Sequence, residues 1–180
     1  MKKIILTAAA VFAISFANAQ EAKSFGFAKG DVYASGSIST SKVGDADAST
    51  TFAPSVGYFV SDNISLAASL ATSNNGDDKS TIIGLGAAYV FNAGNQFSSQ
   101  IGASVGFGNG SESGVDFNAT AFSLSYGINY FVSSNFALTA NLAALEYVSK
   151  KADVAGAKAV NTTSIGVDLS NISLGLAYKF

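Results

Sequence analysis

The sequence predicts an all-β fold, an eight-stranded antiparallel up-and-down transmembrane β-barrel preceded by a cleaved signal peptide. Three observations predict it. Apolar residues alternate with small or polar ones in segments of about ten residues, short and long connections alternate, and the N-terminus has the pattern of an export signal. The composition agrees, since 48% of the residues are hydrophobic and only 12% are charged. Little of the surface is therefore expected to face water.

The N-terminal residues have the parts of a secretory signal peptide. Two lysines precede an apolar stretch over residues 4–16, and Ala17 and Ala19 supply the small side chains that signal peptidase accepts. The apolar stretch is shorter than the roughly 20 residues of a membrane-spanning helix. We therefore expect cleavage before Gln20 and export through the periplasm to the outer membrane. This divides the chain into a signal peptide, residues 1–19, and a barrel domain, residues 20–180.

The mature chain contains eight segments in which apolar residues recur at every second position, as they do on one face of a strand. In one segment Ile83, Leu85 and Tyr89 fall on one face. Gly84 and Gly86 fall on the other, where a soluble sheet would carry charged side chains. Small residues suit the narrow interior of an eight-stranded barrel. The expected strands are residues 32–40, 51–60, 64–72, 83–91, 97–107, 121–130, 136–143 and 172–180.

Three places depart from this pattern. Tyr33 falls on the small-residue face of the first strand. Pro54 lies inside the second strand, where it cannot donate a hydrogen bond, and marks either the outer part of that strand or a local irregularity. Ile165 has the opposite parity to Ile172, which predicts either a β-bulge near residues 170–171 or an extension of the last strand above the membrane.

The connections between the expected strands alternate in length, and this sets the topology. Short turns of a membrane barrel lie in the periplasm and long loops lie outside the cell. Most charged residues of the mature chain lie in the long connections, as loops in water require. The short connections are residues 61–63, 92–95 and 133–135, and the long ones are residues 41–50, 73–80, 108–116 and 148–162.

Aromatic residues gather near the short connections and the C-terminus, where a membrane barrel carries an aromatic girdle. Ordinary sheet packing also enriches aromatic side chains, but without regard to their depth along the strand. By position alone, Phe59, Phe131 and Tyr178 are expected to belong to the girdle as well. The principal members of this predicted periplasmic girdle are Tyr58, Tyr89, Phe91, Phe97, Tyr130 and Phe136.

The C-terminal segment Leu-Gly-Leu-Ala-Tyr-Lys-Phe, residues 174–180, resembles the terminal signal of bacterial outer-membrane barrels. In that family the barrel-assembly machinery reads the final strand. Residues 54–63, Pro-Ser-Val-Gly-Tyr-Phe-Val-Ser-Asp-Asn, look like the second strand and first turn of small porin-like, OmpX/OmpA-type barrel domains. The resemblance implies an architecture and transfers no active site. It implies that the assembly machinery recognises Leu174, Leu176, Tyr178 and Phe180.

The composition argues against most catalytic and nucleic-acid functions. The chain has no histidine and no cysteine, so the commonest general base and the usual zinc ligands are missing. Its net charge of −2 does not give the basic surface that nucleic acids require. We therefore expect no enzyme activity, no cofactor and no nucleic-acid partner.

The charged loop residues suggest two ligands, each with a simpler alternative. Paired aspartates are candidate ligands for a divalent cation, because hard cations take carboxylate oxygens, although solvated loop tips explain them better. Lysines of the longest loop are candidate contacts for lipopolysaccharide phosphates, although loop solubility explains them as well. The aspartates are Asp45, Asp47, Asp77 and Asp78, and the lysines are Lys150, Lys151 and Lys158.

The sequence therefore predicts a non-enzymatic outer-membrane barrel with a structural or surface-interaction role through four extracellular loops. The alternative is a narrow porin-like channel for small solutes, which eight strands permit only if waters line up through the lumen. The expected partners are outer-membrane lipid, lipopolysaccharide and, during biogenesis, the barrel-assembly machinery. The surface partner is left open.

Overall fold

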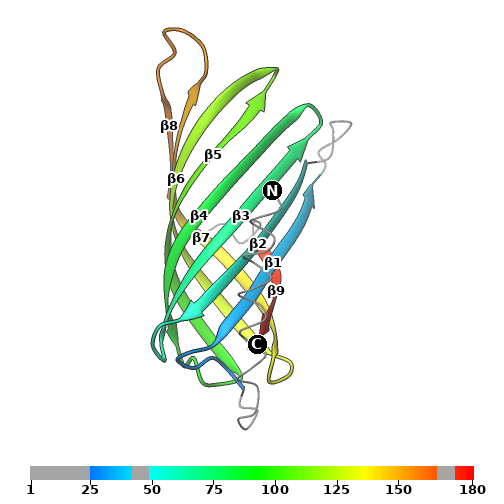
Figure 1. The fold of residues 1–180 in the computed structure, drawn as a ribbon, viewed down its shortest axis with the longest axis vertical. Coiled ribbons are helices and arrows are strands. Elements are labelled where there is room, and N and C mark those ends of the chain that lie inside the picture. Colours follow the sequence, from blue (N-terminus) through cyan, green and yellow to red (C-terminus); the bar gives the residue numbers. More distant parts are fainter. Residues whose placement is uncertain (1–24, 42–48, 166–172) are drawn as a thin grey trace, which may run out of the picture.

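The computed structural model describes residues 25–41, 49–165 and 173–180, and it shows a tall barrel of antiparallel strands (Figure 1). The expected cleavage site at Ala17, Ala19 and Gln20 lies outside the described residues, as do Asp45 and Asp47. The strands are β1 (Val32–Ser41), β2 (Ser49–Phe59), β3 (Ile64–Asn75), β4 (Asp78–Phe91), β5 (Phe97–Glu112), β6 (Val115–Phe131), β7 (Phe136–Ala152), β8 (Val160–Ile165) and β9 (Ser173–Lys179).

Each strand from β1 to β7 pairs with the next, and β9 closes the ring by pairing with both β7 and β1. β8 pairs with the far half of β7, so β8 and β9 occupy the same place in the wall at different heights. The result is the predicted closed antiparallel barrel of eight strands. Among the described residues, no helix is long and apolar enough to cross a membrane.

The two ends of the barrel differ, and we name them by their connections. The end with tight links after β2, β4 and β6 is the short-turn end, and it also carries the C-terminus (Figure 1). The opposite end is the hairpin end, where β5, β6, β7 and β8 project (Figure 1). β5, β6 and β7 have 16, 17 and 17 residues. A tilted strand needs only about 9–11 residues to cross a membrane, so these three extend well beyond that length.

The strand extensions differ from the loops expected at residues 108–116 and 148–162. β5 and β6 are joined by Ser113 and Gly114 alone, both with positive φ, which is the type I′ geometry favoured in two-residue hairpins. Polar composition had suggested loops there. In water, however, a strand can continue with polar side chains on both faces, so polarity marks the end of the apolar band rather than the end of the strand.

The irregular positions follow the backbone chemistry. The β2–β3 pairing is interrupted next to Pro54, which has no N–H to donate; this is the local irregularity that was one of the two alternatives for this residue. Opposite β6, β7 carries an extra residue between Ala143 and Leu145, a bulge that the sequence analysis did not place. Ile165 lies in β8 and pairs with Leu145, which in turn pairs with Leu124 of β6. Residues 170–171, where one of the two alternatives for Ile165 placed a bulge, lie outside the described residues.

Candidate functional site

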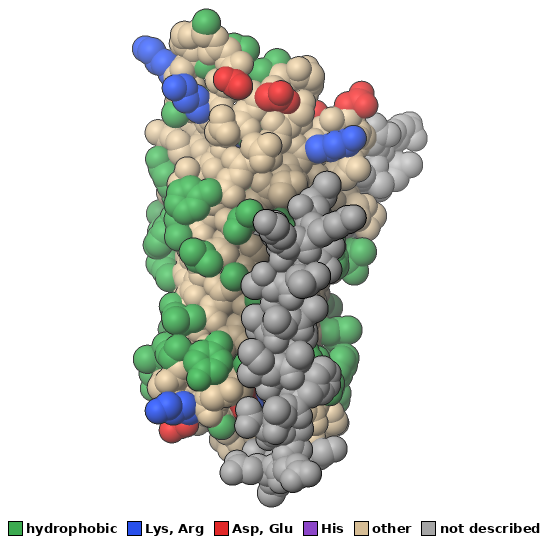
Figure 2. Space-filling view, in the orientation of Figure 1, with side chains coloured by type: hydrophobic (Ala, Val, Ile, Leu, Met, Phe, Trp, Pro, Cys, Tyr) green, Lys and Arg blue, Asp and Glu red, His purple; other side chains and the backbone are tan. Residues whose placement is uncertain are grey.

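The outward face of the wall is an apolar band. Figure 2 shows hydrophobic side chains along the flanks of the barrel, with charged side chains gathered at its two ends. The band comes from the alternating apolar positions of every strand, because successive side chains point to opposite faces. A water-soluble barrel would not leave so many large apolar side chains exposed. Its exposed members include Phe52, Val56, Leu66, Leu70, Ile83, Leu85, Ile101, Phe107, Phe122, Leu124, Tyr126, Ile128, Leu138, Leu174 and Leu176.

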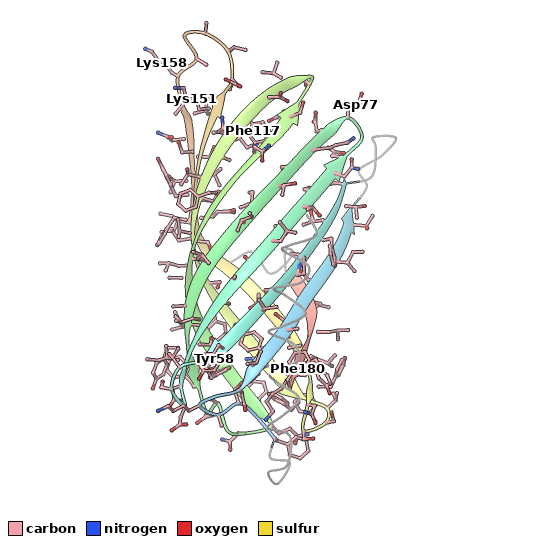
Figure 3. The ribbon with its side chains drawn as sticks, viewed as in Figure 1. Tyr58, Asp77, Phe117, Lys151, Lys158 and Phe180 are labelled. Carbon is pink, nitrogen blue, oxygen red and sulfur yellow. The ribbon has the colours of Figure 1, made fainter. Side chains whose placement is uncertain are left out.

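The residues predicted to form the girdle lie at the short-turn end, and most are exposed on the outward face. Figure 3 shows Tyr58 and Phe180 at this end of the barrel. The Tyr178 and Phe180 rings meet edge to face, 5.0 Å apart. Exposed on the outward face are Tyr58, Tyr89, Phe91, Phe97, Tyr130 and Tyr178, whereas Phe136 is half-buried.

Phe59 and Phe131 do not belong to this girdle, and here the expectation from sequence position was wrong. Their side chains are 1% and 0% exposed and point into the barrel. Each lies one residue after an outward tyrosine, Tyr58 or Tyr130, so strand alternation turns it to the inner face. Their distance from the turn correctly predicted the height of Phe59 and Phe131 along the barrel, but it did not predict which face of the strand they occupy.

The lumen is lined by neutral polar side chains. The hydroxyls of Ser35 and Ser55 are 2.6 Å apart, which is hydrogen-bonding distance. The Asn129 Nδ2 donates to the Gln100 Oε1 over 3.4 Å, and the Gln100 Nε2 donates to the Asn141 Oδ1 over 3.5 Å. These side chains border a cavity of about 320 Å³ whose lining, within the described residues, contains no charged side chain. Such a lining suits water or a neutral polar solute.

An aromatic cluster, which we call the floor, closes the lumen at the short-turn end. Phe27, which precedes β1, stacks on Phe59 with ring centroids 4.6 Å apart and meets Phe131 edge to face at 4.8 Å. Tyr33 adds a third contact to Phe27 at 5.5 Å. The Tyr33 ring also covers Gly57, where a Cβ would come within 2.2 Å of it. The floor therefore depends on a residue without a side chain opposite Tyr33.

Backbone hydrogen bonds hold the segment that carries Phe27. The Phe27 N–H donates to the Ala93 carbonyl over 2.5 Å, and the Gly30 N–H donates to the Phe59 carbonyl over 2.9 Å. The Lys29 N–H donates to the Asp62 carboxylate over 3.2 Å. The segment is thus bound to three separate turns or strand ends, which keeps Phe27 inside the barrel.

Lys179 joins the floor to the closing strand. Its ammonium group donates to the Gly26 carbonyl over 2.6 Å and lies 3.5 Å from the Asp31 carboxylate. It also lies 5.7 Å from the centroid of the Phe131 ring. The side chains of this ion pair are only 11% and 21% exposed, so water screens the attraction weakly. The pair therefore fastens the N-terminal segment to β9, next to the seam with β1.

The hairpin end is charged and carries its own contacts. The Ser113 N–H donates to the Asp78 carboxylate over 2.7 Å, which links the β3–β4 and β5–β6 hairpins. The Lys150 ammonium lies 3.4 Å from the Glu112 carboxylate and 4.8 Å from the centroid of the Phe117 ring. Figure 3 shows Lys158 and Lys151 at the β7–β8 hairpin and Asp77 at the β3–β4 turn.

A family model described as the outer membrane protein beta-barrel domain matches residues 5–180. The chain belongs to this family. No curated protein sequence matches the chain significantly. The resemblance drawn from the C-terminal strand and from residues 54–63 is therefore confirmed at the level of the family.

Solved structures of small outer-membrane barrels share the fold. The N-terminal β-barrel domain of Pseudomonas aeruginosa OprF is 18% identical, with a TM-score of 0.59, and the match covers 86% of this chain and 100% of that one. Neisserial surface protein A is 20% identical, with a TM-score of 0.53, and the match covers 83% of this chain and 95% of that one. At these identities the likeness concerns the fold.

Membership of the outer-membrane barrel family gives the outward band its environment. Its apolar side chains face lipid, and the closed ring satisfies the backbone groups that hydrocarbon cannot. The polar lumen and the charged hairpin end are then the two surfaces left for function. Among the described residues, no cluster of three or more acidic side chains is arranged to hold a metal ion, and Asp78 is engaged by Ser113.

The floor could not be identified from the alternating pattern of the strands. Phe27 lies outside any alternating segment, so periodicity says nothing about it. In the structure Gly26 has a φ of +83°, a backbone conformation that glycine adopts easily. The available signal in the sequence was the Phe-Gly-Phe at residues 25–27, separated from β1 by four residues.

Proposed function

We propose that this chain is a non-enzymatic structural barrel of the outer membrane that presents its hairpin end at the cell surface. The observation that carries the proposal is the excess length of β5, β6 and β7 at the hairpin end, with 16, 17 and 17 residues. A strand of about 9–11 residues already spans the bilayer, so the excess forms a sheet in water. Short turns of such barrels usually lie in the periplasm, which supports an orientation with the hairpin end outside.

The other parts of the proposal concern biogenesis and lipid. Residues 1–19 would direct export and be removed before Gln20. The assembly machinery would then read the C-terminal strand, whose Leu174, Leu176 and Tyr178 present an exposed apolar row. Lipopolysaccharide would surround the outer half of the band, with Lys150, Lys151 and Lys158 near the height of its phosphates.

The sealed floor argues against a narrow channel. A solute crossing the lumen would have to displace Phe27, Phe59 and Phe131 from contacts of 4.6 and 4.8 Å. The polar cavity above them is therefore better described as a blind polar space than as a conduit. The absence of histidine and cysteine likewise favours a role without chemistry.

Cysteine labelling in intact cells tests the proposed orientation, and the chain offers a clean background because it has no cysteine. We expect Ala155→Cys, in the β7–β8 loop, to react with a maleimide that cannot cross membranes. Gly94→Cys, in the β4–β5 turn, should react only after the outer membrane is permeabilised; a Cβ at Gly94 meets open space, so the variant should fold. Labelling of Gly94→Cys alone in intact cells would reverse the orientation and refute the proposal.

A further inference from the structure

The inner face of the wall changes its chemistry between the lumen and the hairpin end. Along β6, Asn129 and Ser125 face inward, and Phe117 lies on the same face because an even number of positions separates it from both. Opposite, β7 presents Val148 and β8 presents Val160 on this inward face. Beyond Glu146, which lies on the same inward face two residues before Val148, these three side chains form an apolar wall.

This apolar wall borders a hollow of about 650 Å³ between the β5–β6 and β7–β8 hairpins, which we call the outer groove. Its size lies within the roughly 300–1,000 Å³ of small-molecule sites. Val115 and Val160 are 42% and 68% exposed there, which is costly for apolar side chains in water. The residues lining the outer groove include Val115, Phe117, Val148, Lys150, Lys158 and Val160.

The charges of the outer groove are placed at its rim. The Lys150 ammonium sits over the Phe117 ring at 4.8 Å, at the boundary between the apolar wall and water. Lys158 borders the groove as a second cation, while Glu112 is the single acidic side chain in its lining. The rim therefore has an excess of positive charge and complements an anion.

We infer that the outer groove binds one long-chain fatty acid anion, with its carboxylate at Lys150 and Lys158 and its chain against Phe117, Val148 and Val160. The positive charge of Lys150 and Lys158 favours an anionic head group, and the apolar wall next to Lys150 favours an apolar tail. The ion pair between Lys150 and Glu112 is half exposed and therefore weak. A fatty acid carboxylate at the rim can replace Glu112 as the partner of Lys150. The inference rests on the proposed function, since it needs the hairpin end in water.

The absence of tryptophan in the chain allows a site-specific test. Val160→Trp places a single fluorophore in the outer groove, and Val154→Trp places one at an exposed position of the same hairpin outside it. Each variant is refolded into phosphatidylcholine nanodiscs and titrated with a dibrominated fatty acid, which quenches nearby tryptophan. We expect saturable quenching at position 160 and weak, non-saturating quenching at position 154. Equal quenching at both positions would overturn the inference.

Charge variants in the Val160→Trp background test the head group. The double change Lys150→Gln and Lys158→Gln should raise the half-saturating concentration about tenfold, the loss expected for charge-assisted contacts. Lys151→Gln is the matched control, because its side chain leaves β7 on the opposite face from Lys150, and it should leave the titration unchanged. The dibrominated methyl ester should bind about tenfold more weakly than the acid.

Three further results would overturn the inference: an unchanged titration in the double variant, equal binding of the methyl ester, or concentration-dependent crosslinking of Val160→Cys barrels without quenching of Val160→Trp, which would assign the groove to a second copy. Heat-dependent gel mobility, measured on the same samples, shows that each barrel is folded. The cysteine labelling described above tests the proposed function separately, so a failure of the groove is distinguishable from a failure of the orientation.

Discussion

Replacing Leu85 with arginine should lower the free energy of unfolding in a phospholipid bilayer by about 2–4 kcal/mol. Leu85 is 60% exposed on the outward face of β4, between Ala68 of β3 and Val105 of β5. It lies well inside the band that begins at the girdle residues of β4, and a guanidinium group there must enter hydrocarbon or distort the bilayer. Denaturant titration of the barrel refolded into phosphatidylcholine vesicles measures the change.

The control for this effect is Asn109→Arg. Asn109 lies on the outward face of β5 near the hairpin end, opposite Thr81 of β4, where polar side chains replace the apolar band. An arginine near the interface costs only about 0–1 kcal/mol. Equal destabilisation by the two variants would mean that the cost of an arginine on the outward face does not depend on its depth in the bilayer. The assignment of the apolar band to lipid would then be wrong.

Replacing Phe27 with alanine should remove about 3 kcal/mol of stability, the magnitude found for large-to-small changes in packed cores. The Phe27 side chain is 5% exposed and contacts both Phe59 and Phe131, so its loss leaves a space in the floor. Phe25→Ala, two residues earlier and 44% exposed, is the matched control and should change stability little. Denaturant unfolding in vesicles compares the two variants.

The same pair of variants decides between a sealed barrel and a channel. In planar bilayers the wild-type barrel and Phe25→Ala should be silent, whereas Phe27→Ala should show current steps, because the floor is then incomplete. Regular single-channel steps from the wild-type protein would contradict a sealed floor and restore the porin-like alternative. Unchanged stability of Phe27→Ala would show that the aromatic contacts do not hold the segment in place.

The apolar band and its strands could be predicted from the sequence because alternation is a local pattern that the bilayer enforces over the depth it covers. Ile83, Leu85 and Tyr89 lie on the outward face as expected, and so do most of the girdle residues. Strand alternation also explains why Phe59 and Phe131 do not belong to the girdle. Each directly follows a tyrosine of the girdle and therefore faces inward. Distance from a turn fixes height in the membrane, and parity fixes the face.

The features that could not be predicted lie outside the segments in which apolar and small residues alternate. Above the bilayer both faces of a strand meet water, so the sequence of β5 and β6 up to the Ser113–Gly114 turn looked like a loop. Phe27 precedes the first strand and acts through contacts with β2 and β6 that are distant in sequence. The outer groove likewise needs Phe117 and Val160 to be brought together by two hairpins, which only the three-dimensional register reveals.

Gel mobility with and without heating tests the central claim, a closed eight-stranded barrel in the outer membrane, most directly. The protein is refolded into detergent or phosphatidylcholine vesicles and run in dodecyl sulfate without boiling. A closed barrel resists the detergent because its backbone hydrogen bonds are all internal to the ring. The account predicts that the unboiled sample migrates at a different apparent mass from the boiled one; identical mobility of the two samples, under conditions in which the chain is bound to lipid, would contradict it.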